Sequence, residues 1–292
     1  MRSFIKQFGY GMLYLIKCLL NPNFHKFRLK DSHLGEKAYI LANGPSLKKT
    51  LEDYDAGIIP IDSNTFMVNH GALDEKHFMA IRPKHYCFDD PIFYRDYTPK
   101  LEATKKLYSI FQNKVDWEMN IYICFTKEEE FKALVDYSKI TNPHIHFIKI
   151  NKKFCAELKS LRCKLWDTGY FMPDTGTIAN TAIYVALLEG YKEIELFGVD
   201  HSQFLDLAVN DHNQLCSVDR HFYDVNNEPK LKPFIDTSGD EEIPFRVSKF
   251  FAFLYAQFYS HELLREFADY KGAKVLNCTP HSYTDAYERK LY

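Results

Sequence analysis

The sequence has almost no net charge. Its 37 lysine and arginine residues are balanced by 39 aspartate and glutamate residues, which leaves a formal net charge of −2 over 292 residues. Bulk electrostatics therefore give no support for a nucleic-acid partner, and none is expected. The chain also has no internal repeat and no low-complexity tract, and it is long enough to bury a full hydrophobic core.

The seven cysteines lack the spacing of a disulfide framework or a metal site. They are scattered and odd in number, and they form neither a CxxC pair nor a Cys/His ligand pattern. This usage fits a reduced cytoplasmic protein better than a secreted, disulfide-bonded one.

The first 30 residues lack an apolar run long enough to span a bilayer comfortably, and no small-residue cleavage site of a signal peptide follows them. Apolar residues recur at helical spacing from Phe4 to Leu19, interrupted by Lys17 and accompanied by further basic residues. We expect residues 1–30 to form an amphipathic helix. It either makes peripheral contact with the inner face of the cytoplasmic membrane, or packs on the domain or on a second subunit.

Beyond residue 31, apolar β-rich runs alternate with helix-like stretches. Strands are predicted at 38–42, 65–68, 85–88, 120–125, 145–150, 193–198 and 274–276, and helices at 48–54, 127–137, 152–161, 177–189 and 243–270. This alternation predicts one α/β domain over 31–292, doubly wound and Rossmann-like, with a mainly parallel sheet and helices on both faces. The aromatic residues of the last predicted helix could also pack between the subunits of a homo-oligomer.

Hydrogen-bonding residues follow one predicted strand after another. Asn43-Gly44, Asn69, Asp90, Asp200-His201-Ser202 and His281 all come shortly after strand ends. Ligands of parallel sheets bind beyond the carboxyl ends of the strands, so we expect these residues to meet around one anionic ligand.

The stretch Asn43-Gly44-Pro45-Ser46 is the clearest single signal. It lies between a strand and a helix, where Gly44 permits a tight turn that a side chain would obstruct and Ser46 is a good N-cap. Free backbone N–H groups at such a helix start suit a phosphate.

Residues 203–243 break the alternation. No helix is readable after Ser202, and the segment has no clear hydrophobic period. It contains aromatic residues and histidines, among them His221 and Tyr223, which argue against disorder. We therefore expect an irregular insertion that forms a lid over the site.

Two separated segments carry a resemblance to known families. Residues 41–47 (LANGPSL), and 175–177 followed by 182–187, 190–194 and 198–200, resemble the opening and the middle of the family 42 bacterial sialyltransferases. The same segments, with Met172-Pro173, the residues around Asp219 and 221–223, and 277–289, also resemble uncharacterised relatives of the archaeal 6-hydroxymethylpterin pyrophosphokinases. Many of those relatives occur in surface-polysaccharide gene clusters.

The first resemblance implies a GT-A-like variant of the fold and transfer of sialic acid from CMP-sialic acid, with inversion and without a metal. It places Asn43 against the nucleotide or sugar and Asn69 against the donor. Asp90-Pro91 stands where the family has Asn-Pro. Thr175-Gly176, followed by Thr177, offers backbone N–H groups and a hydroxyl at a helix N-terminus. Gly44, Ser46, Ser202 and His281 complete the expected donor-binding set.

The chain departs from that family at the catalytic positions. The two tyrosines that stabilise the leaving phosphate are absent after Asp200, and the next tyrosine is Tyr223. The position of the family's catalytic histidine falls near Tyr255, and His261 lies further along the same predicted helix. The base must therefore come from another residue unless the alignment shifts.

Inverting transfer requires a base for the acceptor hydroxyl and a group that stabilises the leaving phosphate. His201, which Asp200 could hold in one tautomer, and His221, beside Tyr223, are the candidate bases. Tyr223 and His281 are candidates for contact with the phosphate. Each of these residues could equally be structural.

Asp89 and Asp90 offer an alternative chemistry. Adjacent carboxylates can hold a divalent metal that bridges phosphates, with Asp200 as a further ligand, although a turn-capping pair is the simpler interpretation. We expect no cofactor for the transferase, whereas an ATP-dependent pyrophosphokinase acting on a pterin-like alcohol would need Mg²⁺.

The leading hypothesis is a glycosyltransferase that moves a CMP-activated acidic sugar to a surface glycan, free or lipid-linked. The alternatives are the pyrophosphokinase and a non-catalytic nucleotide-binding accessory protein.

Overall fold

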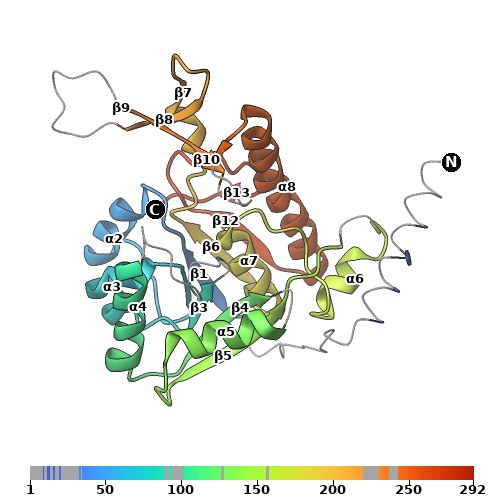
Figure 1. The fold of residues 1–292 in the computed structure, drawn as a ribbon. Helices are drawn as coiled ribbons and strands as arrows, with labels where there is room; N and C mark the ends of the chain where they lie inside the picture. Colours follow the sequence, from blue (N-terminus) through green and yellow to red (C-terminus); the bar gives the residue numbers. More distant parts are fainter. Residues whose placement is uncertain are drawn as a thin grey trace.

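Eight strands form one sheet at the centre of the computed structural model (Figure 1). Across the sheet the order is β13 (Glu288–Arg289), β12 (Lys274–Asn277), β6 (Glu193–Phe197), β1 (Lys37–Leu41), β2 (Thr65–Val68), β3 (His85–Phe88), β4 (Met119–Phe125) and β5 (Ile145–Asn151). Every neighbouring pair is parallel. The predicted doubly wound, Rossmann-like α/β fold is therefore confirmed.

The structure describes residues 35–88, 101–125, 128–155, 158–219, 230–236 and 243–292, with Gly9, Met12, Leu13, Ile16, Leu20, His33, Asp90 and Phe93 singly. Most of the predicted N-terminal amphipathic helix lies outside these residues. Among the helices that the structure does describe, none has a stretch long and apolar enough to cross a bilayer.

Helices cover both faces of the sheet (Figure 1). Side chains of α6 (Arg162–Asp167), α7 (Ile178–Glu189) and α8 (Val247–Lys271) pack on one face, and those of α2 (Leu47–Asp55), α3 (Glu75–Ile81), α4 (Leu101–Lys114) and α5 (Glu128–Ser138) pack on the other. Strand β1 faces both layers, because Ala38 and Ile40 join the first core and Tyr39 and Leu41 the second. A parallel strand that is buried on both faces reads as a continuous apolar run.

The predicted helix over 152–161 is wrong. Cys155 donates its backbone N–H to the carbonyl of Met172 at 3.2 Å, and Met172 donates to the carbonyl of Lys153 at 2.9 Å. This pairing holds the start of the segment extended, and the helix α6 begins only at Arg162. The apolar residues of the segment recur at a spacing that imitates a helix, but they reach the core from an extended chain and a turn.

The insertion after β6 is not irregular where it is described. It contains β7 (Leu207–Val209), β8 (Leu215–Asp219) and β9 (Lys230–Pro233) in an antiparallel sheet, and β10 (Ile235–Asp236) pairs with β11 (Ile243–Pro244). Strands of two to five residues are too short to show a period in the sequence. Figure 1 places this small sheet at the end of the molecule where β6 ends.

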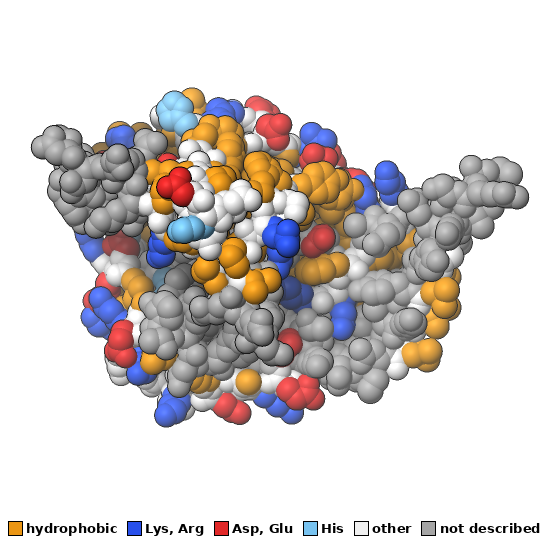
Figure 2. Space-filling model, turned by 45° about the horizontal axis from the view of Figure 1, so that its top comes forward, with side chains coloured by type: hydrophobic (Ala, Val, Ile, Leu, Met, Phe, Trp, Pro, Cys, Tyr) orange, Lys and Arg blue, Asp and Glu red, His pale blue; other side chains and the backbone are white. Residues whose placement is uncertain are grey.

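The first half of α8 packs against the small sheet. Phe250 and Leu254 share a cluster with Leu215, whereas Phe251 and Tyr255 are exposed, at 54% and 68%. Figure 2 turns this end of the molecule forward, and hydrophobic side chains gather on it. The helix is therefore aromatic on both its buried and its exposed sides.

Candidate functional site

A cleft of about 290 Å³ lies beyond the ends of β1 and β6. In the strand order of the sheet, β1 has β2 and its successors as neighbours in one direction, and β6 followed by β12 in the other. Strands β1 and β6 thus flank the switch point, where ligands bind in open parallel sheets. The lining residues are Ala42, Asn43, Gly44, Pro45, Thr177, Ile178, Ala179, Gly198, Val199, Asp200, His201, Ser202, Gln203 and Asp206.

The loops after β1 and β6 touch at Gly44. Its N–H donates to the carbonyl of Gly198 at 2.9 Å. A Cβ at position 44 would lie 2.0 Å from Oδ2 of Asp200 and 2.4 Å from the carbonyl oxygen of Gly198. Only glycine fits this contact, which agrees with the turn expected from the sequence.

Asp200 and Ser46 join the two loops, and both differ from their expected roles. The N–H and the hydroxyl of Ser46 donate to the two carboxylate oxygens of Asp200, at 3.2 and 2.8 Å. Ser46 makes no side-chain cap of its own helix, because Asp200 supplies the carboxylate at the start of α2. The expectation that Asp200 fixes the tautomer of His201 is wrong, since the ring of His201 bonds a different residue. The phosphate expected at the start of α2 would compete with this carboxylate.

The N-terminus of α7 opens on the same cleft. Thr177 and Asn180 form a capping box, in which the backbone N–H of Asn180 donates to the Thr177 hydroxyl and the Asn180 amide oxygen accepts from the Thr177 backbone N–H. Ile178 and Ala179 follow, and their N–H groups have no acceptor in their own helix. Both residues line the cleft, so the positive end of the helix dipole is presented to it.

Gly176 fixes this helix start against α8. A Cβ at Gly176 would lie 2.6 Å from Cα of Gln257, and the Gly176 N–H donates to the Ser260 hydroxyl at 3.0 Å. The hydroxyl of Thr175 and the amide nitrogen of Gln257 are both buried, and neither has a hydrogen-bond partner among the described residues. The amide oxygen of Gln257 accepts from Gln203, which lines the cleft.

His201 begins a chain of three hydrogen-bonding groups. Its Nε2 lies 2.8 Å from Nε2 of His261, and Nδ1 of His261 lies 3.1 Å from the hydroxyl of Tyr287. The backbone φ of His201 is +52°, a left-handed conformation that is uncommon outside glycine and clusters at functional sites. The second ring nitrogen, Nδ1, bonds no other described residue.

Burial keeps both histidine rings neutral. Desolvation lowers the pKa of His201 to about 4. Desolvation, with a smaller contribution from His201, holds the pKa of His261 well below 6.5. Because one Nε2 must donate to the other, the two rings have complementary tautomers. At neutral pH, His201 is thus an uncharged imidazole in the cleft.

The remaining predicted residues divide into three groups. Asn43, Ser202 and Thr177 line the cleft with Gly44, Asp200 and His201. Asn69, Asp90 and His281 follow neighbouring strands at the same edge of the sheet but do not line the cleft, and Thr175 and Gly176 lie behind it. Asp89, His221 and Tyr223 lie outside the described residues.

Asn69 is tied to the cleft through Asn43. The amide of Asn43 donates to the carbonyl of Val68 at 3.1 Å, directly before Asn69. Asn69 has a φ of +49°, and its amide oxygen is buried with no hydrogen-bond partner in the part of the chain that the structure describes. Asp90 follows β3, two strands away from β1. Among the described residues, no three His, Cys, Asp or Glu side chains gather as ligands for a metal ion.

Sequence reasoning missed two parts of the site. Tyr287 carried no sequence signal for a role beside His201, because it lies far from it in the chain and only the fold joins them. Gln203 and Gln257 gave none either. His261 could be found only as a displaced counterpart of a family histidine.

A larger hollow of about 510 Å³ lies elsewhere, between α4 and α5. It is lined by Lys105, Tyr108, Ser109, Gln112, Asn113, Tyr137, Ser138 and Lys139, none of which follows a strand of the sheet. We assign the candidate site to the cleft between β1 and β6, because the polar residues that follow these two strands line it together with the N-terminus of α7.

Comparison of the chain with known proteins gives no matching family model and no match among curated proteins.

Proposed function

We propose that this protein is a glycosyltransferase that moves a sugar from a nucleotide donor to a glycan acceptor with inversion, and that a CMP-activated acidic sugar is its donor. The observation that carries the proposal is the position of His201. It is a neutral imidazole, in the same cleft as the N-terminus of α7, and its Nδ1 bonds none of the described residues.

The cleft supplies the groups that such a transfer needs. The α7 N-terminus receives the anionic phosphate or carboxylate of the donor. Asn43, Gln203 and Asp206 offer amide and carboxylate groups for ribose or sugar hydroxyls. The volume of the cleft is at the lower end for small-molecule sites, so it holds a phosphate and one attached ring while the rest of the donor extends out of it.

The reaction follows from these positions. Nδ1 of His201 takes the proton of the acceptor hydroxyl as its oxygen attacks the anomeric carbon from the face opposite the nucleotide. The bond to the leaving phosphate breaks, and the α7 N-terminus stabilises the charge that develops on that phosphate. Asp200 acts through Ser46 and keeps the two loops together.

A thermal-shift screen tests the ligand class. CMP, UMP, GDP, ADP and ATP are each added with and without Mg²⁺. At tenfold its Kd, CMP should stabilise the fold by about 1.4 kcal/mol and raise Tm by roughly 2–3 °C. A shift with Mg²⁺-ATP alone would instead support the pyrophosphokinase, and no shift with any nucleotide would contradict the proposal.

A variant pair tests the base. With CMP-sialic acid and a glycan acceptor, His201→Gln should lower kcat by about 10²-fold or more while CMP still binds. His212→Gln is the matched control, since His212 is exposed on the small sheet and does not line the cleft. Nucleotide binding without any transfer by the unsubstituted protein would leave a nucleotide-binding accessory role.

A further inference from the structure

A second hollow lies at the far end of the hydrogen-bonded chain that begins at His201. Its volume is about 150 Å³, and it is formed between the second half of α8 and strands β12 and β13. Tyr287 lines it together with Arg265, Asp269 and Glu288, among others. The chain of His201, His261 and Tyr287 therefore runs from the cleft to a residue that lines this second hollow.

We propose that His261 and Tyr287 form, with His201, a proton relay that leads from the cleft to this second hollow. His261 and Tyr287 are positioning residues, because they act on the reacting groups only through His201. The connection runs over contacts of 2.8 Å between the imidazoles and 3.1 Å between His261 and the Tyr287 hydroxyl. The use of this relay during turnover rests on the proposed function, whereas its existence does not.

The relay moves one proton without creating a buried charge. At the start, Nε2–H of His201 donates to Nε2 of His261, and Nδ1–H of His261 donates to the Tyr287 oxygen. When Nδ1 of His201 takes a proton in the cleft, the Nε2 proton passes to His261. The Nδ1 proton of His261 then passes to the Tyr287 oxygen, which gives up its own proton to water in the hollow. Both imidazoles finish neutral, with their tautomers exchanged.

Neutral imidazoles at the end of the relay matter because burial makes a charged ring at position 201 unfavourable. Only 1% of His261 is exposed, and Phe258 packs edge-on against the His201 ring. An imidazolium is poorly solvated in such surroundings, so a single histidine would hold the extra proton at a high cost. A partner that passes the proton on removes this cost. A histidine with a purely structural role in the core would need only one hydrogen-bond acceptor, and no chain of hydrogen bonds that leads to the surface.

NMR of the ring nitrogens tests the relay without any substrate. In the full chain labelled with ¹⁵N-histidine, long-range ¹H–¹⁵N spectra distinguish Nδ1–H from Nε2–H tautomers, and His201→Gln and His261→Gln assign the two rings. The fraction of Nε2–H at His201 should equal the fraction of Nδ1–H at His261. Tyr287 bonds Nδ1 of His261 in either tautomer, as acceptor or as donor, so Tyr287→Phe should move the two tautomer ratios by the same factor.

Tyr184→Phe is the matched control. Tyr184 is also buried, but its hydroxyl lies within hydrogen-bond distance of the carbonyls of Phe171, at 2.7 Å, and Trp166, at 2.9 Å, rather than of either histidine. It should leave both ratios unchanged. Tautomer fractions of His201 and His261 that are unrelated in the unsubstituted protein would overturn the relay, and so would a Tyr287→Phe variant in which the ratio of one ring moves and that of the other does not.

Kinetics test its use in turnover. With CMP-sialic acid, Tyr287→Phe should lower kcat about tenfold, leave the KM for the donor unchanged and alter the solvent deuterium isotope effect, whereas Tyr184→Phe should alter neither the KM nor the isotope effect. If the unsubstituted protein transfers no sugar, the proposed function fails. The tautomer measurement still decides the relay in that case.

Discussion

Gly44 lies at a close contact between the two loops of the cleft. Its replacement by alanine would place a methyl group against the Asp200 carboxylate and the Gly198 carbonyl. The loops would have to separate, and the hydrogen bonds from Ser46 to Asp200 would be lost. We expect Gly44→Ala to reduce the free energy of unfolding in urea by about 1–3 kcal/mol and to abolish the thermal shift with CMP.

Gly57→Ala is the control for this substitution. Gly57 has a φ of +72°, so alanine there also costs stability, but nothing lies within 4 Å of the added Cβ. Unfolding in urea should become easier while nucleotide binding persists. Retention of the CMP shift by Gly44→Ala would show that the contact between the loops does not shape the site.

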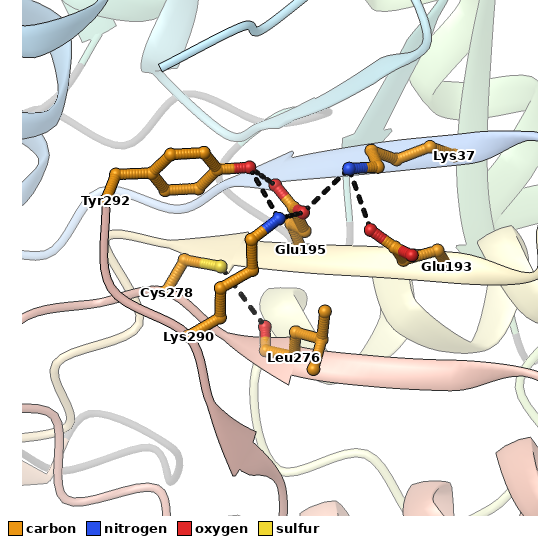
Figure 3. Close-up of polar contacts among 7 residues, drawn as sticks. All are labelled: Lys37, Glu193, Glu195, Leu276, Cys278, Lys290 and Tyr292. Carbon is orange, nitrogen blue, oxygen red and sulfur yellow. Dashed lines mark hydrogen bonds and ion pairs between the residues drawn. The ribbon is translucent and has the colours of Figure 1, made fainter. Parts of the chain in front are cut away.

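Glu195 is a carboxylate buried within the sheet. It is fully buried on β6 and bonds Lys290 at 2.5 Å, Lys37 at 3.0 Å and the hydroxyl of Tyr292 at 2.5 Å (Figure 3). Burial raises the pKa of this carboxyl, but the contacts with Lys290, Tyr292 and Lys37 outweigh that effect and lower it overall. The carboxylate thereby holds the C-terminal residues against β6.

Removing this charge should be costly. Glu195→Gln leaves two lysines beside a neutral amide, and we expect the free energy of unfolding at pH 7.5 to fall by about 3–5 kcal/mol. Glu193→Gln, two residues earlier on the same strand, removes a half-exposed partner of Lys37 and should cost less than about 1 kcal/mol. Equal costs in urea titrations would show that the buried carboxylate contributes no more than the exposed one.

At the scale of elements, α7 depends on the cap at its N-terminus. Eleven of its twelve residues are buried, so its first N–H groups rely on Thr177 and Asn180. Thr177→Ala should reduce the free energy of unfolding by about 1 kcal/mol, because it removes the hydroxyl that accepts from Asn180. Thr177→Ser keeps the hydroxyl and should stay close to the unsubstituted protein. Denaturant midpoints that are equal for Ala and Ser would contradict this role.

The sequence predicted most of the sheet well because its central strands, β1, β2 and β3, are buried on both faces and read as largely apolar runs. The ranges 65–68 and 85–88 coincide with β2 and β3, and the other five predicted strands differ from the structure by at most one residue at either end. The helices α3, α4 and α6 and the short strand β13 went unpredicted, and 152–161 was misassigned. Over 152–161, the spacing of apolar residues does not distinguish a helix from an extended chain that pairs with distant residues.

The site could be predicted only in part, for a related reason. Polar residues at strand ends can be read from the sequence once a parallel sheet is expected, which located Asn43, Asp200 and His201. Their partners depend on packing between elements. The contact of His261 with Tyr287 joins α8 to the residue before β13, and Asp200 bonds Ser46 rather than its neighbour. No local pattern encodes these contacts.

At the scale of the whole molecule, buried histidines set the response to acid. Burial holds the pKa values of His85 and His261 well below 6.5 and lowers that of His201 to about 4. In the unfolded chain these groups titrate near 6.5. Below that pH the unfolded state therefore binds more protons than the folded state. Stability then rises with pH between about 4 and 6.5, and it is lost as the pH falls through this range.

The expected fall in the free energy of unfolding is large enough to measure directly. At pH 5.5 each such histidine costs about 1.4 kcal/mol relative to pH 7.5, so the free energy of unfolding in urea should fall by about 4 kcal/mol for the three. Carboxylates whose pKa is lowered in the fold, such as Glu195 and Glu266, lose their contribution to stability only below about pH 4.5.

The double variant His201→Gln/His261→Gln should remove about two thirds of this fall in the free energy of unfolding. The exposed pair His144→Gln/His146→Gln should leave it intact. A stability that is flat between pH 7.5 and 5.5 would mean that the folded protein takes up protons at these rings as readily as the unfolded chain does, so that the neutral imidazoles on which both the base and the relay depend do not persist.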